Sequence, residues 1–276
     1  MSEPRSWLFV PADSEKKIGK AIESEADAVI FDLEDSVAPA QKSAARQILK
    51  DLGKRSGGPQ WWVRINPLRT DEHRKDLDVI GIADIHGIVL PKAEGGADVA
   101  ELAHRTGNIP IHAIVTETAA SLFGMLSYRD PKSSLAAMSW GAEDLSTALG
   151  ASSKYDADGS LSYTYKLARS LCLAGAVAAG VQPVDGVFSD FRDDAGLLAE
   201  AQAAAREGFT GKLAIHPAQV GVINAAFTPT ADEVSHARAI VDAFDADPDA
   251  GVLSISGRMV DRPHLVQARR VLDRAR

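Results

Sequence analysis

The chain has 276 residues, of which 45% are hydrophobic and 25% charged, and its formal net charge at pH 7 is −8. This composition is typical of a soluble globular protein with a substantial core, and the negative charge argues against a general nucleic-acid or anionic-membrane binder. No apolar stretch is long enough to span a membrane, no secretory signal opens the sequence, and one cysteine excludes an intrachain disulfide, so we expect a cytoplasmic protein.

Short apolar runs typical of β-strands alternate with amphipathic helical segments along most of the chain. The strand-like runs lie at residues 7–10, 28–31, 61–65, 87–90, 111–115, 135–140, 184–188 and 213–215. The clearest helical patterns between them lie at residues 13–25, 38–52, 96–105 and 193–207. Eight strands alternating with helices predict an α/β fold of the TIM (β/α)8 barrel type. A doubly wound sheet is the rival, but the Gly-rich first turn of that fold is missing.

The pattern changes after about residue 228. A helical segment at residues 231–245 leads into an acidic turn, an alternating stretch at residues 252–256 and the loop GRMVDRP. A basic helix at residues 264–276 follows. We therefore predict a barrel domain at residues 1–228 and a C-terminal hairpin-plus-helix extension at residues 229–276. Extensions beyond a complete barrel commonly serve assembly, so we expect oligomer contacts there.

Polar side chains mark the carboxyl ends of the predicted strands, where barrel enzymes carry their chemistry. In strand order these residues are Asp32, Glu34, Asp35, Arg64, Asn66, Lys92, Glu94, Thr116, Glu117, Glu143, Asp144, Asp190 and His216. Each one taken singly could equally cap a helix or form a structural ion pair. Gathered at one end of a closed barrel, they indicate a site.

Carboxylates outnumber cations in this set, and that excess favours a divalent metal ion. Oxygen ligands without a Cys or His cluster suit Mg²⁺, or Mn²⁺, rather than zinc. Lys92 has an alternative role, which is to neutralise the carboxylates directly. His112, inside the fifth strand, is expected to line the barrel rather than to bind metal.

Eight motifs occur in the order seen in a known protein family. They are RSWLFVPAD, VIFDLEDSV, VRIN, VLPKAE, IVTETA, WGAEDL, AIHPAQV and GRMVDRP. Together they resemble the citrate lyase beta-subunit-like proteins of the HpcH/HpaI aldolase superfamily, which includes malyl-CoA and citramalyl-CoA lyases. The resemblance implies a Mg²⁺-dependent TIM barrel that assembles as a homotrimer or a multiple of trimers.

The resemblance also assigns roles to matching residues. It implies that Glu117 and Asp144 are the metal ligands, and that Glu117 also contributes to substrate binding. Glu34 and Asp35 resemble outer groups that hold the waters of the metal.

Two further roles come from the same resemblance. Arg64 resembles the catalytic arginine that binds the substrate carboxylate. Asp261 resembles a catalytic acid that the C-terminal segment delivers to a neighbouring subunit, so the extension would complete the active site.

Two local features qualify the resemblance. Thr116 stands between the fifth strand and Glu117, and a one-residue slip in a strand turns a side chain to the opposite face. The orientation of residues 116 and 117 is therefore open at this point. Asp35 occupies the position where the pyruvate-class aldolases carry a histidine, and this difference favours the CoA-thioester branch.

We therefore expect a carbon–carbon lyase that converts a short 3-hydroxy dicarboxylyl-CoA, such as malyl-, citramalyl- or citryl-CoA, into a 2-oxo acid and an acyl-CoA. One alternative is the beta subunit of a citrate lyase complex, which acts on an acyl-carrier thioester. Another is a malyl-CoA thioesterase.

Overall fold

The chain forms two compact units, residues 3–224 and 225–276, in a computed structural model that describes residues 3–53, 57–81, 83–130, 133–255 and 257–275. The first unit contains a closed barrel in which every neighbouring pair of strands is parallel and the last strand pairs with the first. The predicted TIM (β/α)8 fold is thus confirmed.

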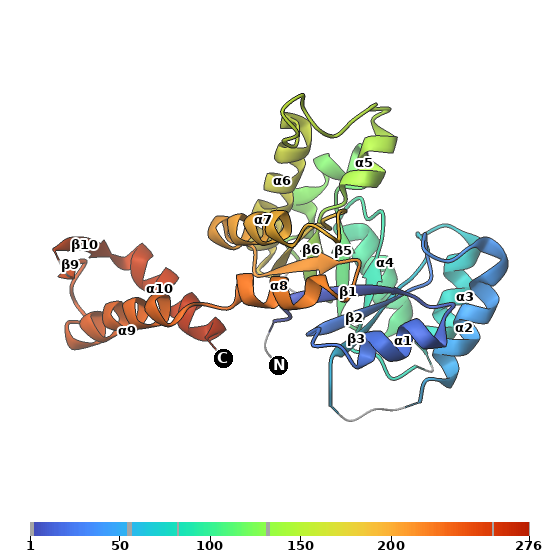
Figure 1. The fold of residues 1–276 in the computed structure, drawn as a ribbon, viewed down its shortest axis with the longest axis horizontal. Helices are drawn as coiled ribbons and strands as arrows, with labels where there is room; N and C mark the ends of the chain where they lie inside the picture. Colours follow the sequence, from blue (N-terminus) through green and yellow to red (C-terminus); the bar gives the residue numbers. More distant parts are fainter. Residues whose placement is uncertain (1–2, 54–56, 82, 131–132, 256, 276) are drawn as a thin grey trace. The chain divides into compact units, whose positions relative to one another are not determined.

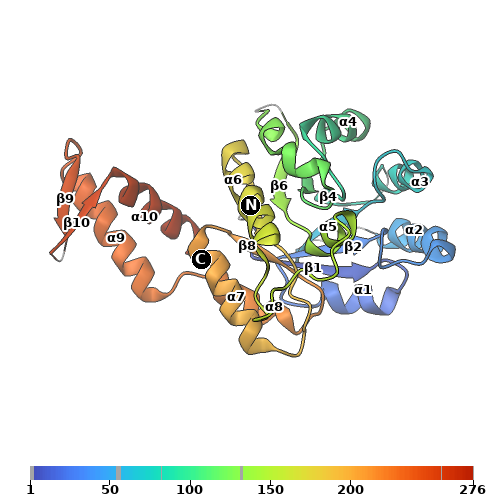
Figure 2. The ribbon, with the colours of Figure 1, turned by 90° about the horizontal axis from the view of Figure 1, so that it is seen from above.

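The elements of the barrel follow the predicted alternation. The strands are β1 (Ser6–Pro11), β2 (Ala28–Asp32), β3 (Gln60–Arg64), β4 (Gly87–Leu90), β5 (Ile111–Ile114), β6 (Leu135–Ser139), β7 (Gln182–Asp185) and β8 (Gly211–Ala214). The helices are α1 (Glu15–Ile22), α2 (Lys42–Asp51), α3 (Asp71–Ile80), α4 (Gly96–Thr106), α5 (Ala142–Ala148), α6 (Tyr163–Ala179), α7 (Asp194–Glu207) and α8 (Gln219–Phe227). Figures 1 and 2 show α1 to α4 along the outside of the strands.

The predicted bounds of the seventh strand, residues 184–188, are wrong: the strand begins two residues earlier and ends three residues earlier. β7 ends at Asp185, and a Cβ at the next residue, Gly186, would lie 2.9 Å from Nε1 of Trp140. Val187 packs against the core of the barrel although it belongs to a loop. Its apolar character reflects loop packing, which a pattern of hydrophobicity does not distinguish from a strand.

Aromatic rings fill the interior of the barrel. Trp7 lies with its ring centroid 4.9 Å from that of Trp62 and 4.6 Å from that of His112. His112 lines the interior as expected, but neither of its ring nitrogens has a hydrogen-bond partner among the described residues. Burial lowers the pKa of this histidine to about 3, so the ring is neutral.

The second unit contains the expected hairpin and helix. Helix α9 (Ala231–Ala246) packs against α10 (Arg262–Arg274), and β9 (Val252–Ile255) pairs with β10 (Arg258–Asp261) in an antiparallel sheet. Side chains that include Phe244 and Leu265 form the apolar core of this unit. The expected positions Ser256 and Arg276 lie outside the described residues. Among the described residues, no helix is both long and apolar enough to cross a bilayer.

The lowered pKa of His112 predicts a specific acid sensitivity. Its pKa falls from 6.5 to about 3 on folding, so it contributes stability above pH 6.5 that is lost as the pH falls towards 3. We expect the free energy of unfolding of the wild-type protein to fall by about 2–3 kcal/mol more than that of His112→Gln between about pH 6 and about pH 4.

Urea unfolding at both pH values measures this difference. The matched control is His236→Gln, which changes an exposed histidine on α9 and should leave the pH dependence of the wild-type protein nearly unaltered. Parallel pH profiles for the wild-type protein and His112→Gln would contradict the prediction.

Candidate active site at the carboxyl ends of the barrel strands

Charged side chains from five strand ends, those of β2 to β6, meet at one end of the barrel. The carboxyl groups belong to Asp32, Glu34, Asp35, Glu117 and Asp144, and the cations are Arg64 and Lys92. We call these seven residues the carboxylate cluster. It contains the predicted residues of the barrel site together with Asp32, to which the sequence analysis gave no individual role.

Arg64 is held by a two-pronged ion pair at the ends of β2 and β3. Its Nε lies 2.7 Å from Oδ1 of Asp32, and its Nη2 lies 2.6 Å from Oδ2. Asp32 also accepts hydrogen bonds from the backbone N–H groups of Glu34 and Ser36. Burial alone would raise the pKa of Asp32, but the charge and hydrogen bonds of Arg64 hold it below its usual range. The guanidinium also lies over the ring of Phe9, 4.8 Å from its centroid.

Glu34 connects the two cations of the cluster. Its Oε1 lies 2.5 Å from Nζ of Lys92, and its Oε2 lies 2.9 Å from Nη1 of Arg64. The contact with Arg64 lacks hydrogen-bond alignment, so Oε2 is buried without a hydrogen-bond donor among the described residues. Burial raises the pKa of Glu34 despite both cations. The expectation that Lys92 neutralises the carboxylates is confirmed by its contacts with Glu34, Asp35 and Asp144.

Glu117 points into the cluster because β5 ends at Ile114. After that residue the strand alternation no longer applies, so Thr116 and Glu117 can take separate roles. Thr116 accepts a hydrogen bond from the backbone N–H of Gly141, whereas Oε2 of Glu117 accepts one of 2.6 Å from the backbone N–H of Lys92. Burial raises the pKa of Glu117 to about 8, with further contributions from the charges of Glu34 and Asp144.

The two acids of the WGAEDL motif have different partners. Glu143 is exposed and forms an ion pair with Lys154, while Asp144 lies 3.3 Å from Nζ of Lys92. Asp144 and not Glu143 therefore belongs to the cluster. The glycine of the same motif, Gly141, leaves space for Glu117, because a Cβ at this position would lie 2.8 Å from Cγ of Glu117.

A buried network fixes the segments that follow β2 and β3. Lys42, on α2, donates hydrogen bonds to the backbone oxygens of Leu33 and Glu34 and to Oδ1 of Asn66. Asp76, on α3, accepts from Asn66 and from Arg46. Asn66 was thus correctly placed at a strand end, but its contacts are structural.

The remaining predicted strand-end residues contact their own surroundings. Asp190 accepts a hydrogen bond from the backbone of Arg192, and the ring of His216 stacks on Phe191 with centroids 4.6 Å apart. Glu94 accepts a hydrogen bond from Thr118. These residues have a local structural role in the described contacts.

Asp261 lies in the second unit, at the junction of β10 and α10. Its carboxylate accepts a hydrogen bond from the backbone N–H of His264 and caps α10, and Oδ1 lies 2.5 Å from Nδ1 of the same histidine. The hydrogen bond from the His264 side chain lowers the pKa of Asp261. The α10 helix consequently begins at Arg262, two residues before the expected start.

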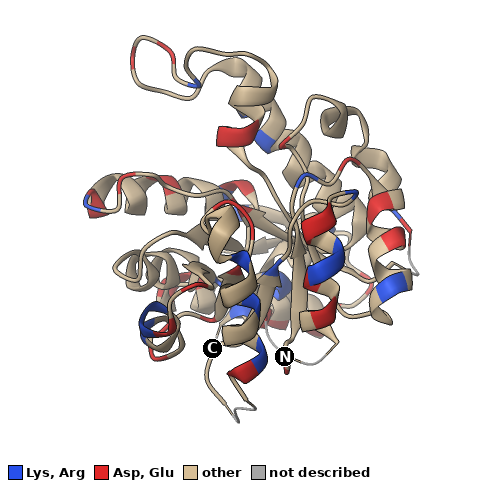
Figure 3. Ribbon diagram, turned by 90° about the vertical axis from the view of Figure 1, so that its right-hand side faces the viewer, with Lys and Arg blue, Asp and Glu red and all other residues tan. Residues whose placement is uncertain are grey.

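The charged residues on the helices are not gathered at one place as those of the carboxylate cluster are. Figure 3 shows acidic and basic segments intermingled on the side of the chain in view, as is typical of solvated helix faces.

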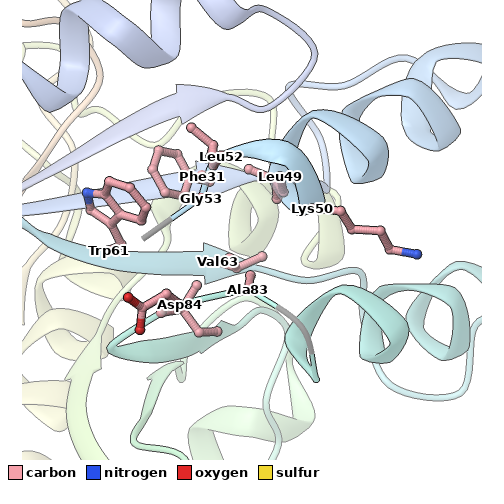
Figure 4. A pocket seen from close by; sticks show the side chains of 10 residues that line it. Phe31, Leu49, Lys50, Leu52, Gly53, Trp61, Val63, Ala83 and Asp84 are labelled. Carbon is pink, nitrogen blue, oxygen red and sulfur yellow. The ribbon is translucent and has the colours of Figure 1, made fainter. Parts of the chain in front are cut away.

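A cavity of about 70 Å³ lies outside β2 and β3, beside Phe31, Leu49 and Trp61 (Figure 4). It is several times smaller than ordinary ligand pockets, and none of the cluster residues lines it.

The pairing of Asp32 with Arg64 gives a stability prediction. Asp32→Asn leaves Arg64 largely buried without its main counter-charge, so we expect the free energy of unfolding to fall by about 2–3 kcal/mol. Urea unfolding without divalent cations measures it. Asp35→Asn is the matched control, because that side chain is 60% exposed and 3.5 Å from Lys92, and it should cost less than about 1 kcal/mol. Equal losses in the two variants would contradict the prediction.

Three relatives match nearly the whole chain. The citrate lyase subunit beta-like protein of Mycobacterium tuberculosis is 38% identical over 269 residues, which cover 98% of this chain and 94% of the relative. A (3S)-malyl-CoA thioesterase of Cereibacter sphaeroides is 36% identical, with coverage of 98% and 94%. The mitochondrial citramalyl-CoA lyase of Rattus norvegicus is 32% identical, with coverage of 97% and 85%.

A solved structure and a family profile agree with these matches. The crystal structure of protein CitE from Mycobacterium tuberculosis, in complex with magnesium, acetoacetate and coenzyme A, superposes with a TM-score of 0.85 at 38% identity. The match covers 99% of this chain and 98% of that one. Residues 5–217 match the profile of one family. The chain therefore belongs to the HpcH/HpaI aldolase/citrate lyase family, a family of carbon–carbon lyases.

Proposed function

We propose that this protein is a Mg²⁺-dependent carbon–carbon lyase that cleaves or forms a short 3-hydroxy dicarboxylyl-CoA thioester. Malyl-CoA, citramalyl-CoA and citryl-CoA are the candidates, and the products of cleavage are a 2-oxo acid and an acyl-CoA. The observation that carries the proposal is the excess of carboxylates in the cluster around the buried Glu117. The magnesium and coenzyme A bound to the Mycobacterium tuberculosis relative support it.

Glu117 and Asp144 are suited to hold the metal ion. A divalent cation would offset the burial that disfavours the charged form of Glu117. Two protein carboxylates are enough for Mg²⁺, which typically takes one or two and keeps its other positions for water and substrate. Asp35 and Oε2 of Glu34, which pairs with Arg64 but accepts no hydrogen bond from the described residues, would hold its waters. The bound cation, Mg²⁺ or Mn²⁺, supplies a Lewis acid that stabilises negative charge on a substrate oxygen.

Arg64 is suited to bind the substrate carboxylate. Its guanidinium has five N–H groups, and its Nε, Nη2 and Nη1 each contact Asp32 or Glu34. Only the contacts of Nε and Nη2 with Asp32 are hydrogen bonds, so at least one N–H on each terminal nitrogen is left for a second carboxylate. The pair with Asp32 fixes the plane of the guanidinium, so the substrate would meet a preset orientation.

Asp261 is proposed to transfer the proton at the thioester carbon, in the active site of a neighbouring subunit. Its lowered pKa suits the carboxylate form, which removes the α-proton when the reaction runs as a condensation. In cleavage the protonated group would return that proton to the enolate. This role requires a homotrimer or another oligomer, which we propose together with a cytoplasmic location.

Hydrolysis is the second candidate function, and the similarity to a (3S)-malyl-CoA thioesterase favours it. The same binding groups would hold malyl-CoA, but water would attack the thioester and release malate and CoA. A beta subunit of a citrate lyase complex would instead need an acyl-carrier thioester. Product analysis separates these activities.

The first test supplies malyl-, citramalyl- and citryl-CoA with Mg²⁺ and identifies the products. We expect a 2-oxo acid from at least one of the three, and loss of turnover in excess EDTA. Asp144→Asn should lower kcat/KM by about a thousandfold or more, because it removes one of two charged ligands.

The matched control for that variant is Glu143→Gln. This neighbouring acid is exposed and paired with Lys154, so its neutralisation should preserve most of the activity. Free malate as the sole product would contradict the lyase proposal and favour the thioesterase. Full activity in excess EDTA would contradict the proposed role of the metal ion.

The second test concerns Asp261 and uses Asp261→Asn. Asparagine caps a helix about as well as aspartate, so α10 should stay folded while the proton-transfer group is lost. Asp261→Asn and Asp144→Asn should each be nearly inactive alone. Mixed oligomers should recover up to about a quarter of wild-type activity, at sites that pair an intact Asp144 with an intact Asp261.

Mass spectrometry of differently labelled chains would verify that subunits have exchanged. Exchange without recovered activity would contradict the shared site. Normal activity of Asp261→Asn would mean that Asp261 only caps α10 and transfers no proton.

A further inference from the structure

Lys92 has an unusual backbone for a lysine at the end of a strand. It follows β4 and Pro91, and its φ of 52° lies in the left-handed region that non-glycine residues rarely adopt. Such strain persists only when surrounding contacts fix it, and it clusters at functional sites. The contacts of Lys92 therefore indicate what the conformation provides.

The left-handed turn lets Lys92 reach carboxylates from three strand ends with two different atoms. Its backbone N–H donates to Oε2 of Glu117 at 2.6 Å. Its Nζ lies 2.5 Å from Glu34 and 3.3 Å from Asp144, with Asp35 at 3.5 Å. The backbone thus holds one proposed metal ligand while the side chain neutralises the other.

The two cations of the cluster differ in how firmly they are held. Arg64 is fixed by paired contacts with Asp32, whereas Lys92 is a point charge on a flexible stem whose side chain is 28% exposed. Its contact with Asp144, at 3.3 Å, is looser than its contact with Glu34. An entering divalent cation would therefore displace Lys92 rather than Arg64.

We propose that Lys92 is the resident counter-ion of the metal site. In the metal-free protein its ammonium holds Asp144 and Glu34 in place, and it yields Asp144 to the divalent cation while its backbone N–H keeps Glu117 oriented. Lys92 is thus a positioning residue that competes with the metal. This inference rests on the proposed function, because it takes Glu117 and Asp144 as the ligands.

Two substitutions remove the ammonium and retain the backbone N–H. Lys92→Gln keeps a side chain of similar reach, and Lys92→Gly also relieves the left-handed backbone. Both should bind Mg²⁺ about tenfold more tightly than the wild-type protein, because a positive charge beside the cation is removed. Lys92→Gln should also have a lower Tm in EDTA. Lys92→Arg, which keeps the charge, is the matched control and should bind Mg²⁺ with nearly wild-type affinity.

Calorimetric titration with MgCl₂ and thermal unfolding with and without EDTA measure both effects. Tighter binding by Lys92→Gln or Lys92→Gly supports the proposal, since loss of a merely structural lysine would not improve Mg²⁺ affinity. If Lys92→Gln does not fold, the Mg²⁺ affinity of Lys92→Gly tests the proposal. Unchanged or weaker binding by both variants would overturn the role of Lys92 alone. Absence of Mg²⁺ binding by the wild-type protein would overturn the proposed metal site, and the role of Lys92 with it.

Discussion

The carboxyl end of the barrel depends on the pairing of Arg64 with Asp32. This pair joins the ends of β2 and β3 by two charged hydrogen bonds in a nearly buried setting, where an unpaired charge would be strongly destabilising. Once the guanidinium is fixed, its remaining terminal nitrogen sets the position of Glu34, and Glu34 in turn holds Lys92. The other carboxylates of the cluster are arranged around that chain of contacts.

The supporting network explains why this charge can be held in place. Lys42 is buried, yet its ammonium is satisfied by two backbone oxygens and by Asn66, so it fixes the loop after β2. Asp76 fixes the loop after β3 in the same way, because it accepts hydrogen bonds from the backbone and the side chain of Asn66. Helices α2 and α3 therefore fix the backbone after β2 and β3 with residues outside the carboxylate cluster, and the acids of the cluster remain for chemistry.

Hydrophobic alternation predicted the barrel because each strand and each helix leaves its own period in the sequence. The same signal misplaced β7, since Val187 packs on the core from a loop. Position at strand ends predicted which residues gather, because parallel strands bring their carboxyl ends to one edge. It did not predict the partners. The pairing of Asp32 with Arg64 depends on the register between β2 and β3, and no single-sequence pattern encodes that register.

The separation of Thr116 from Glu117 shows how local geometry decides a chemical role. The sequence places both after β5, and strand alternation would point only one of them inward. Because β5 ends at Ile114, Thr116 instead fixes the backbone of Gly141, and the missing side chain of Gly141 leaves the space that Glu117 fills. The start of helix α5, which carries Asp144, is thus hydrogen-bonded to the loop that carries Glu117. Two acids that follow neighbouring strands are held beside one another by a threonine and a glycine that carry no charge themselves.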